Sequence, residues 1–456
     1  MMKRILLLLC LLLAVFAFAA CENGEDLSDT ENTDTSMVEL GDTPVTITFW
    51  HCASEEAGVL LEGYIQQFNE ENPYGITVEG IYQGQYADAT TLLKTMLSAE
   101  NVEELPDVMQ MDATGKIPYA TSGLAFTIDD CLAEGGDEGA VSSQLTGALS
   151  NWTYAGEQLG LPFATSTTIT YYNADLLAEA GWDHAPATFA EVEALYQDMQ
   201  ATGLTAKALQ CIPNTPTLAN WLGQLGSDVV DQENGTAGVA SKLACIENGA
   251  LVEFLTAWQS MYESGALVNG ESSVESFVAG ETALLIASSS GLASMLEKVD
   301  GNFTLGTSPY LRVNEEAAAG ATVSGSCLVM FDHQDGLKKA AAWAFVQYLT
   351  SGEIQADFAA HTGYVPSNVD AVEDAAYGAL LTEYPQYNVA MEQISMMPET
   401  MRSVTVGPAT DFYYMINQCV ANMLDQGQTP EEAAANMEKE LNGLLENYLQ
   451  NNSQEE

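Results

Sequence analysis

Basic residues are scarce in this chain of 456 residues, which has 12 Lys and Arg against 64 Asp and Glu and a formal net charge of −52. Proteins bind nucleic acids by neutralising phosphates with clustered Lys and Arg side chains, so we expect no nucleic acid partner. The same deficit opposes attraction to an anionic membrane surface. A strongly charged surface keeps a protein soluble, which is the simplest reason for this composition.

The motifs of nucleotide, metal and nucleophilic enzyme sites are also missing. The sequence has no GxxxxGK[ST] loop, no GxSxG and no HExxH. Its cysteines form no CxxC pair and its histidines no HxxxH pair, so we expect no metal ion and no cofactor. A secreted glycoside hydrolase, which needs only two carboxylates, stays open as an alternative because acidic residues are abundant.

Six cysteines beyond residue 21 stand at wide, irregular spacings: Cys52, Cys131, Cys211, Cys245, Cys327 and Cys419. We expect isolated buried thiols, although one or two disulfides are compatible with a location outside the cell.

The first twenty residues are organised as a secretory signal. Two basic residues precede an apolar stretch from residue 5 to 18, and two alanines follow; the stretch is too short for a permanent membrane helix. Residues 1–20 are therefore predicted to be a signal peptide. Its small-small-Cys ending resembles the lipobox of bacterial lipoproteins, so we expect a lipid on Cys21 that anchors the protein to a membrane. An ordinary signal peptide followed by a structural Cys21 is the alternative.

Residues 21–43 are expected to form a disordered acidic tether. Positions 22 to 43 hold eight Asp or Glu and no Lys or Arg, and they lack the apolar side chains needed for a core. No later segment is apolar and long enough to cross a bilayer. We therefore expect the rest of the chain outside the cytoplasmic membrane.

Strand-like and helix-like segments alternate after the tether. The hydrophobic pattern predicts strands over residues 45–50, 76–82 and 106–111, and helices over 55–72 and 86–99. This order indicates a parallel sheet with helices on its faces, and ligands bind beyond the carboxyl ends of such strands. A second α/β unit begins at residue 165, and the length of the chain also favours two lobes.

Residues farther along the chain also carry signals of helix starts and of a strand. Capping boxes predict helix starts at Thr188, with Glu191, and at Thr429, with Glu432. Residues 274–283 are predicted to be a helix, followed by a strand over 284–291 that ends in a cluster of serines.

Seven segments resemble, in order and spacing, the extracellular solute-binding proteins of ABC importers. The likeness is to the carbohydrate-binding group that includes the maltose-binding and glycerol-3-phosphate-binding proteins. The segments span residues 47 to 368 and read ITFWH, QQFNEENPYGITVEGIYQGQY, LPDVMQMD, LPFATSTTITYYNADLLAEAGW, PATFAEVEALYQDMQATG, GETALLIASSSG and HTGYVPSN. The resemblance implies an α/β fold of the type II periplasmic-binding-protein kind. Two lobes, each a mainly parallel sheet flanked by helices, close over a ligand about a hinge.

The resemblance also implies where the chain passes between the lobes. Crossings are expected near residues 165–172, near 305–312 and near 352. We therefore expect an N-terminal lobe over residues 44–168 with a return segment 310–352, and a C-terminal lobe over residues 169–309 with C-terminal helices 353–450.

Sugars present hydroxyl edges and apolar ring faces, so a sugar site needs aromatic rings that stack and fixed polar groups that pair with hydroxyls. The resemblance places Tyr86, Asp112 and Tyr364 at ligand-contacting positions. It also implies that the backbone at Gly325 approaches the ligand closely. The full set of expected ligand-binding residues is Trp50, His51, Tyr86, Asp112, Thr165, Ser166, Trp221, Ser289, Ser290, Gly325 and Tyr364.

Structural roles are open for several of these residues. Trp50 fits a core position, Asp112 fits a helix N-cap before Thr114, and Ser289 and Ser290 fit a turn.

One departure from the glycerol-phosphate-binding proteins bears on the ligand. Those proteins place an Arg against the phosphate, whereas this chain has Thr405 in VTVG, residues 404–407. Because the charge-assisted pair is lost, we expect a neutral sugar or short oligosaccharide; glycerol-3-phosphate or a glycerophosphodiester is the alternative.

The resemblance further implies a non-enzymatic protein, expected as a monomer, that delivers its ligand to the permease subunits of an ABC importer. A lipidated Cys21 fits the form that such proteins take at the extracellular face of the cell membrane in bacteria of the Gram-positive type.

Overall fold

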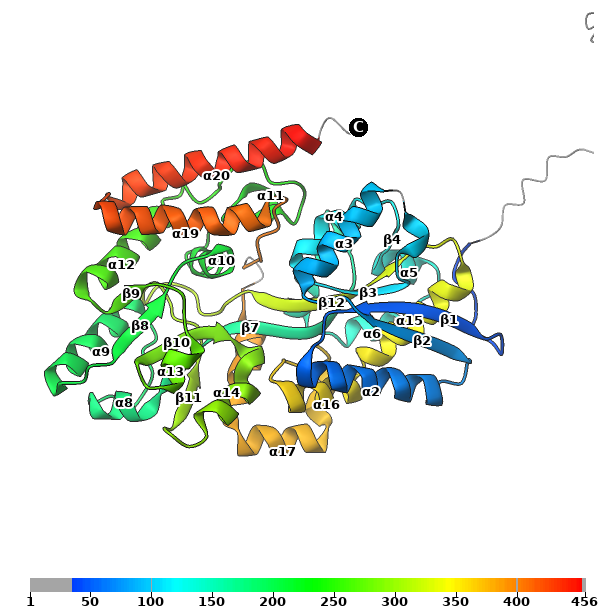
Figure 1. Ribbon diagram of the computed structural model, residues 1–456, viewed down its shortest axis with the longest axis horizontal. Coiled ribbons are helices and arrows are strands. Elements are labelled where there is room, and N and C mark those ends of the chain that lie inside the picture. The colour runs from blue at the N-terminus through cyan, green and yellow to red at the C-terminus, as the bar shows by residue number, and fades with distance from the viewer. Residues whose placement is uncertain (1–34, 100, 399–400, 453–456) are drawn as a thin grey trace, which may run out of the picture. The chain divides into compact units, whose positions relative to one another are not determined.

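The computed structural model of the protein describes residues 35–99, 101–398 and 401–452 (Figure 1). The predicted signal peptide, the predicted lipidation site Cys21 and residues 22–34 of the predicted tether lie outside the described residues. Among the helices that are described, none has the length and apolar content to cross a membrane. Residues from Met37 onward form one compact unit.

The central element of this unit is β7 (Leu161–Asn173), a strand of 13 residues in the middle of a ten-stranded sheet. Its first half pairs antiparallel with β12 (Val323–Phe331), and its second half pairs antiparallel with β10 (Thr282–Ser288) and β11 (Leu305–Ser308). The strand order is β2-β1-β3-β12-β7-β10-β8-β9. Figure 1 shows β7 and β12 side by side between two groups of helices, which belong to the two lobes.

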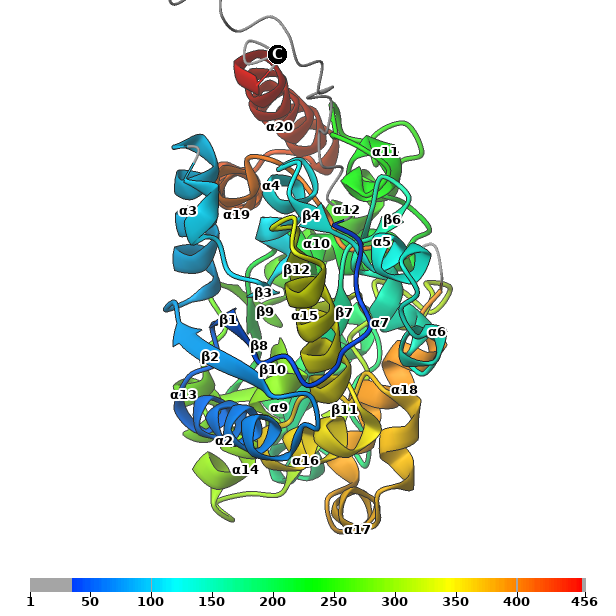
Figure 2. The same ribbon diagram turned by 90° about the vertical axis from the view of Figure 1, so that its right-hand side faces the viewer.

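The first lobe is built on the parallel strands β1 (Val45–His51), β2 (Ile76–Tyr82) and β3 (Val108–Met111), with β12 antiparallel to β3. In Figure 2, which looks onto this lobe, α15 lies in front of the sheet. The helices and short strands of the lobe are α2 (Glu55–Glu71), α3 (Tyr86–Ser98), α4 (Lys116–Ala120), β4 (Ala125–Phe126), α5 (Ile128–Ala133), α6 (Glu138–Ser142), α7 (Thr146–Ser150), β5 (Thr153–Tyr154), β6 (Glu157–Gln158), α15 (Gly336–Leu349) and α16 (Gly352–Thr362).

The second lobe continues from β10 through the parallel strands β8 (Lys207–Cys211) and β9 (Leu267–Asn269). Its helices, and those that follow α16 along the chain, are α8 (Ala174–Glu179), α9 (Phe189–Thr202), α10 (Thr215–Gln224), α11 (Asp231–Gly235), α12 (Ala250–Ser264), α13 (Val274–Val278), α14 (Leu292–Val299), α17 (Ala375–Glu383), α18 (Asn388–Met396), α19 (Ala409–Gln426) and α20 (Pro430–Asn452).

Helix α2 illustrates why these segments pack. Leu61, Tyr64, Ile65 and Phe68 recur at helical spacing and are buried on one face. The ring of Phe68 meets Phe345 of α15 edge-on, with 5.2 Å between the ring centroids. Full burial of an apolar side chain of this size contributes about 1.5–3 kcal/mol, so this one face holds α2 on the lobe.

The strands and helices predicted near the start of the folded part are confirmed to within a few residues. The predicted helix over residues 274–283 is too long, because α13 ends at Val278 and β10 already begins at Thr282. Gly280 has a φ of 74°, a left-handed conformation that favours glycine and ends the helix.

Both predicted capping positions form helix starts. At the start of α20, Thr429 and Glu432 exchange hydrogen bonds as expected. At α9, the Thr188 hydroxyl accepts from the Glu191 amide at 3.3 Å, but the Glu191 carboxylate accepts from the Ala187 amide, one residue before the cap.

Two passages between the lobes lie further along the chain than expected. Residues from 310 to 322 contact the second lobe: Arg312 forms a β-bridge with Thr188, and the Thr322 amide donates to the Asn220 side chain at 2.8 Å. The chain enters the first lobe again with β12. Helix α16 also packs in the first lobe, where Phe358 stacks on Phe163, so residues 353–362 do not join the second lobe.

The six described cysteines are buried free thiols, as the isolated spacing predicted.

Candidate functional site

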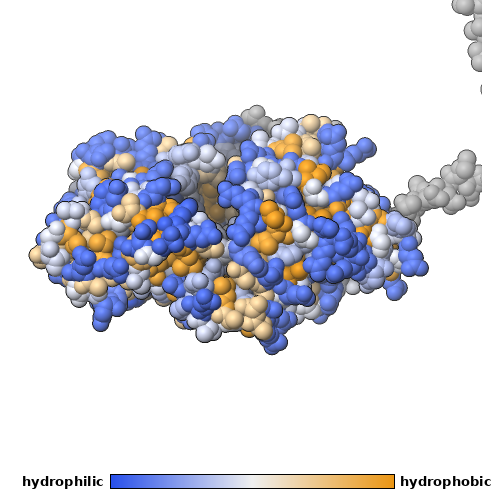
Figure 3. Space-filling model, turned by 60° about the horizontal axis from the view of Figure 1, so that its bottom comes forward, coloured by the Kyte–Doolittle hydropathy of each residue, from blue (hydrophilic) through white to orange (hydrophobic). Residues whose placement is uncertain are grey.

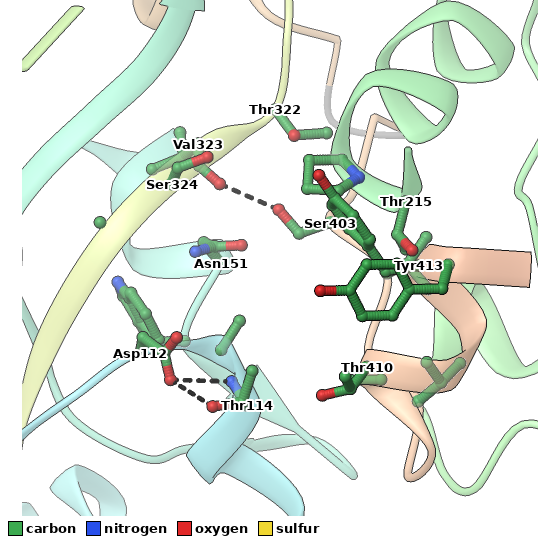
Figure 4. A pocket seen from close by; sticks show the side chains of 18 residues that line it. Asp112, Thr114, Asn151, Thr215, Thr322, Val323, Ser324, Ser403, Thr410 and Tyr413 are labelled. Carbon is green, nitrogen blue, oxygen red and sulfur yellow. Dashed lines mark hydrogen bonds between the residues drawn. The ribbon is translucent and has the colours of Figure 1, made fainter. Parts of the chain in front are cut away.

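A cavity of about 480 Å³ lies between the two lobes (Figure 4). The first lobe contributes the turn after β3 and the residues before β5, the second lobe contributes the starts of α10 and α19, and the chain entering β12 passes between them. The face shown in Figure 3 is hollowed between the lobes, with hydrophilic residues spread over it. The cavity thus occupies the position expected for a ligand in a two-lobed α/β protein.

Asp112 is the single charged side chain among the described residues that line the cavity. Its Oδ1 accepts from the Thr114 amide at 3.1 Å and from the Thr114 hydroxyl at 2.6 Å (Figure 4). Burial raises the pKa of the Asp112 carboxyl, and the bonds from Thr114 oppose this shift. Asp112 therefore caps a helical turn, as the alternative interpretation expected, and it also lines the cavity, where its contact with a ligand stays a prediction.

Gly325 borders the cavity at an irregularity in the pairing of β12 with β7. Its φ is 105°, and a Cβ at this position would lie 2.0 Å from the carbonyl oxygen of Ala164. The close approach that requires glycine is therefore made by the neighbouring strand β7. The glycine was expected from the family motif, whereas this reason for it comes from the structure.

Aromatic rings line both sides of the cavity. Trp152 comes from the first lobe, and Tyr413 and Tyr414 come from α19, where their rings meet edge-on at 5.3 Å. The Tyr413 hydroxyl accepts from the Asn214 side-chain amide at 3.4 Å. These three aromatic residues were not predicted as ligand contacts; the FYYM stretch in α19 is the one local signal that could have indicated two of them.

Lys116, at the start of α4, lies behind the wall formed by Asp112 and Trp152. Its side chain is fully buried, with Nζ 3.4 Å from the Thr405 hydroxyl and 5.4 Å from the centroid of the Trp152 ring. Burial lowers the pKa of the Lys116 ammonium to about 8, against the opposing effects of Cys327 and Asp112. Because Thr405 precedes α19, this contact joins the two lobes beside the cavity.

Tyr86 and Tyr364 belong to a buried polar group that adjoins the cavity. The Gln110 side chain donates to the Tyr86 hydroxyl at 2.9 Å and to the Ser326 hydroxyl at 3.0 Å. Burial raises the pKa of Tyr86, with further contributions from Tyr364 and Asp112 nearby. These two predicted tyrosines therefore lie close together, next to Asp112.

The ring of Tyr364 stacks on Phe358 of α16, with 5.4 Å between centroids and 14° between planes. Burial raises the pKa of the Tyr364 hydroxyl, while a hydrogen bond with Ser290 lowers it. The serine comes from the turn after β10 in the second lobe, so this pair also links the two lobes.

Three predicted hydroxyl residues hold the crossing strand. Thr165 accepts from the Val365 amide through its carbonyl at 2.7 Å, and Ser166 pairs with Ser324 across to β12. The Ser289 hydroxyl accepts from the Thr167 amide at 3.2 Å. All three side chains are buried. Ser289 fixes β7 through its side chain, whereas Thr165 and Ser166 do so through the backbone.

The predicted residues at the end of β1 are buried in the first lobe. Trp50 is only 5% exposed and packs in a core cluster, in agreement with the alternative interpretation of this residue. His51 lies between the rings of Phe49 and Tyr82, and burial lowers the pKa of its imidazole.

Trp221 is a correction to the expected site. Its side chain has no exposed surface, and its ring stacks on Phe254 at 5.3 Å and on Tyr310 at 5.3 Å. The indole nitrogen donates to the Leu311 carbonyl at 3.2 Å. The residue is therefore part of the second lobe's core, because α10 turns this face toward α12 and not toward the cavity.

Known proteins of similar sequence and structure are solute-binding proteins. The sn-glycerol-3-phosphate-binding periplasmic protein of Escherichia coli strain K12 is 23% identical over 413 residues, which cover 88% of this chain and 93% of that protein. The structure of UgpB from Mycobacterium tuberculosis with glycerophosphocholine matches with a TM-score of 0.72 at 21% identity, covering 90% of this chain and 100% of that one. The cyclic alpha-maltosyl-1,6-maltose binding protein of Arthrobacter globiformis matches with a TM-score of 0.73 at 18% identity, covering 89% and 100%.

These structures confirm the two-lobed fold that the sequence segments predicted. A family model described as bacterial extracellular solute-binding protein matches residues 63–387, which is most of the chain and includes both lobes. The chain belongs to the family of bacterial extracellular solute-binding proteins.

Proposed function

We propose that this solute-binding protein captures a neutral sugar or short oligosaccharide in the cavity between its lobes and delivers it to an ABC importer. The observation that carries the proposal is the cavity's composition. Tyr413 and Tyr414 offer ring faces for stacking, hydroxyl and amide side chains offer hydrogen bonds, and the only charged lining group among the described residues is Asp112. An ionised carboxylate accepts hydrogen bonds from two sugar hydroxyls.

Some predicted site residues that do not line the cavity would contact a ligand that extends beyond it. Tyr86, Tyr364 and Ser290 lie at the edge where the lobes meet, so a ligand that extends toward them would contact both lobes. Such a ligand stabilises the closed arrangement in proportion to its preference for that arrangement. Hinge closure of this kind then presents the closed form to the permease.

Glycerol-3-phosphate or a glycerophosphodiester is the second candidate, because a related structure holds glycerophosphocholine. The charges beside this cavity favour a phosphoester less than a neutral sugar. Arg402, the arginine nearest to Thr405 in sequence, is turned to Glu233 at 3.2 Å, and Lys116 is buried behind Trp152. A phosphate in the cavity would meet the Asp112 carboxylate without a cation on the described lining.

A glycoside hydrolase is disfavoured by the same geometry. Hydrolysis of a glycosidic bond uses two carboxyl groups on opposite sides of the bond, and the described lining residues supply one. The family to which the chain belongs is defined by solute binding. The membrane anchor at Cys21, the monomeric state and the Gram-positive-type host belong to the proposal as sequence-based expectations.

The test is a thermal-unfolding screen with mono- and oligosaccharides beside glycerol-3-phosphate, since a ligand of the native state raises the melting temperature. We expect a saccharide to do so and the phosphoester to have no effect. Tyr413→Ala should weaken binding of that saccharide about tenfold through lost stacking. The control is Tyr74→Ala, which truncates a tyrosine exposed at the turn before β2. A shift with glycerol-3-phosphate and with none of the saccharides contradicts the proposal.

A further inference from the structure

A second hollow lies beside the cavity between the lobes. A groove of about 940 Å³ is lined in part by Ala113, Thr114 and Val406, which also line the cavity. Ala113 and Thr114 belong to the first lobe and Val406 to the segment before α19, so the lining residues that the two spaces share come from both lobes.

The walls of the groove also come from both lobes. Helices α3 and α4 form one wall, and Gly407 and Tyr448, from α20, form the other. In Figure 1, α3 and α4 face α19 and α20 across the upper side of the molecule. A molecule in this groove would therefore be held by the same pair of lobes as a ligand in the cavity.

Tyr448 is the aromatic surface of the groove. Its ring lies directly on the backbone at Gly407, where a Cβ would be 2.1 Å from Cζ of the ring. Any larger residue at 407 would displace the ring, so the glycine sets the position of Tyr448 beside the groove. Burial raises the pKa of the Tyr448 hydroxyl, and a tyrosine ring face of this kind can stack on a sugar.

Three hydroxyl side chains belong to the opposite wall of the groove. Ser98, Thr121 and Ser122 each donate to a backbone carbonyl of their own segment, at 2.8, 2.8 and 2.7 Å. A hydroxyl that donates in this way still has lone pairs that accept hydrogen bonds. The wall therefore presents acceptors to hydroxyl-rich ligands, and Lys94 adds a donor.

We propose that the groove is a second binding region that holds the outer units of an oligosaccharide whose first units occupy the cavity. The inference rests on the proposed function and extends it, because it assigns the protein a ligand longer than a disaccharide. The shared lining residues place the two spaces next to each other, as a single chain molecule that occupies both would require. One aromatic face opposite a wall of acceptors matches the two surfaces of a sugar ring.

The test measures dissociation constants by calorimetry for malto-, cello- and xylo-oligosaccharides, each from the disaccharide to the hexasaccharide. In the series that binds, we expect affinity to rise about tenfold beyond the disaccharide. Tyr448→Ala should remove most of this gain and leave the disaccharide constant unchanged, whereas Tyr448→Phe should keep the gain. Tyr384→Ala, at an exposed tyrosine elsewhere, is the control. Thr121→Gln, which fills the groove from an exposed position, gives an independent variant that should also remove the gain.

The possible outcomes separate the two proposals. Disaccharide binding with no gain for longer chains overturns the second binding region and leaves the proposed function standing. Loss of disaccharide binding in Tyr448→Ala also overturns the second binding region, because Tyr448 would then affect the arrangement of the lobes around the cavity and not the outer sugar units alone. Absence of binding to every saccharide overturns both.

Discussion

Replacing the buried Lys116 by methionine should stabilise the protein at neutral pH. The ammonium lies between the lobes with no exposed surface, where it contacts the Thr405 hydroxyl and the ring of Trp152. Neither partner carries a formal charge. Methionine keeps a similar length and apolar character without a charge to desolvate, and such replacements of buried charges are often stabilising.

The magnitude follows from the pKa of the amine. Burial lowers the pKa of Lys116 from 10.5 to about 8, and each pKa unit corresponds to about 1.4 kcal/mol, so the charged form costs about 3 kcal/mol in the folded state. Lys116→Met loses a hydroxyl hydrogen bond and a cation–π contact, together worth about 1–2 kcal/mol. We expect a net gain of about 1–2 kcal/mol at pH 7.

The pH dependence of the stability difference between the two proteins shows whether the buried charge causes it. Since the folded pKa lies below the unfolded one, the penalty is complete below pH 8 and disappears as pH rises toward 10.5. The stability of the natural protein should therefore rise relative to Lys116→Met over this interval. Titratable groups distant from Lys116 cancel in the comparison, whereas Asp112 and Cys327 interact with its charge.

The assay is urea unfolding of both proteins at several pH values, followed by tryptophan fluorescence. Lys94→Met, at an exposed lysine on α3, is the control and should change stability by less than about 0.5 kcal/mol. If Lys116→Met is less stable than the natural protein at pH 7, and the difference does not vary up to pH 10.5, the assigned burial penalty is refuted.

Two glycine substitutions should act in opposite directions. Gly325→Ala places a Cβ 2.0 Å from the Ala164 carbonyl at a φ of 105°; we expect a loss of about 3 kcal/mol from strain and overpacking, seen as a lower melting temperature, and an unchanged melting temperature would contradict the geometry. Gly63→Ala lies at an exposed position within α2 with nothing within 4 Å of the new Cβ; we expect a gain of about 1 kcal/mol from helix propensity. That gain would appear as a higher urea midpoint, and a lower one would count against it.

The strands and helices at the start of the first lobe could be predicted because each one is specified by the hydrophobic pattern within its own few residues. The alternation in VTITFW and the helical spacing of Leu61, Tyr64 and Phe68 each determine a burial pattern within a few residues. The end of α13 was missed although Gly280 marks it, because an apolar run does not show by itself where a helix stops and a strand starts.

Two residues that the resemblance singled out, Asp112 and Gly325, border the cavity, and their contact with a ligand stays a prediction. Trp221 was misplaced because an aromatic residue on a helix has the same sequence pattern whether it faces a core or a cavity. The packing of α10 against Phe254 on α12 decides between these environments.

The sequence by itself determined the order of strands and helices and the family, since both depend on patterns that can be read along the chain. Only the tertiary structure decided which side chains line the cavity. Asp112 and Tyr413 lie far apart in sequence and face one space because β7 and β12 set the two lobes side by side. That arrangement depends on the packing of both cores at once, so the sequence of a single segment does not specify it.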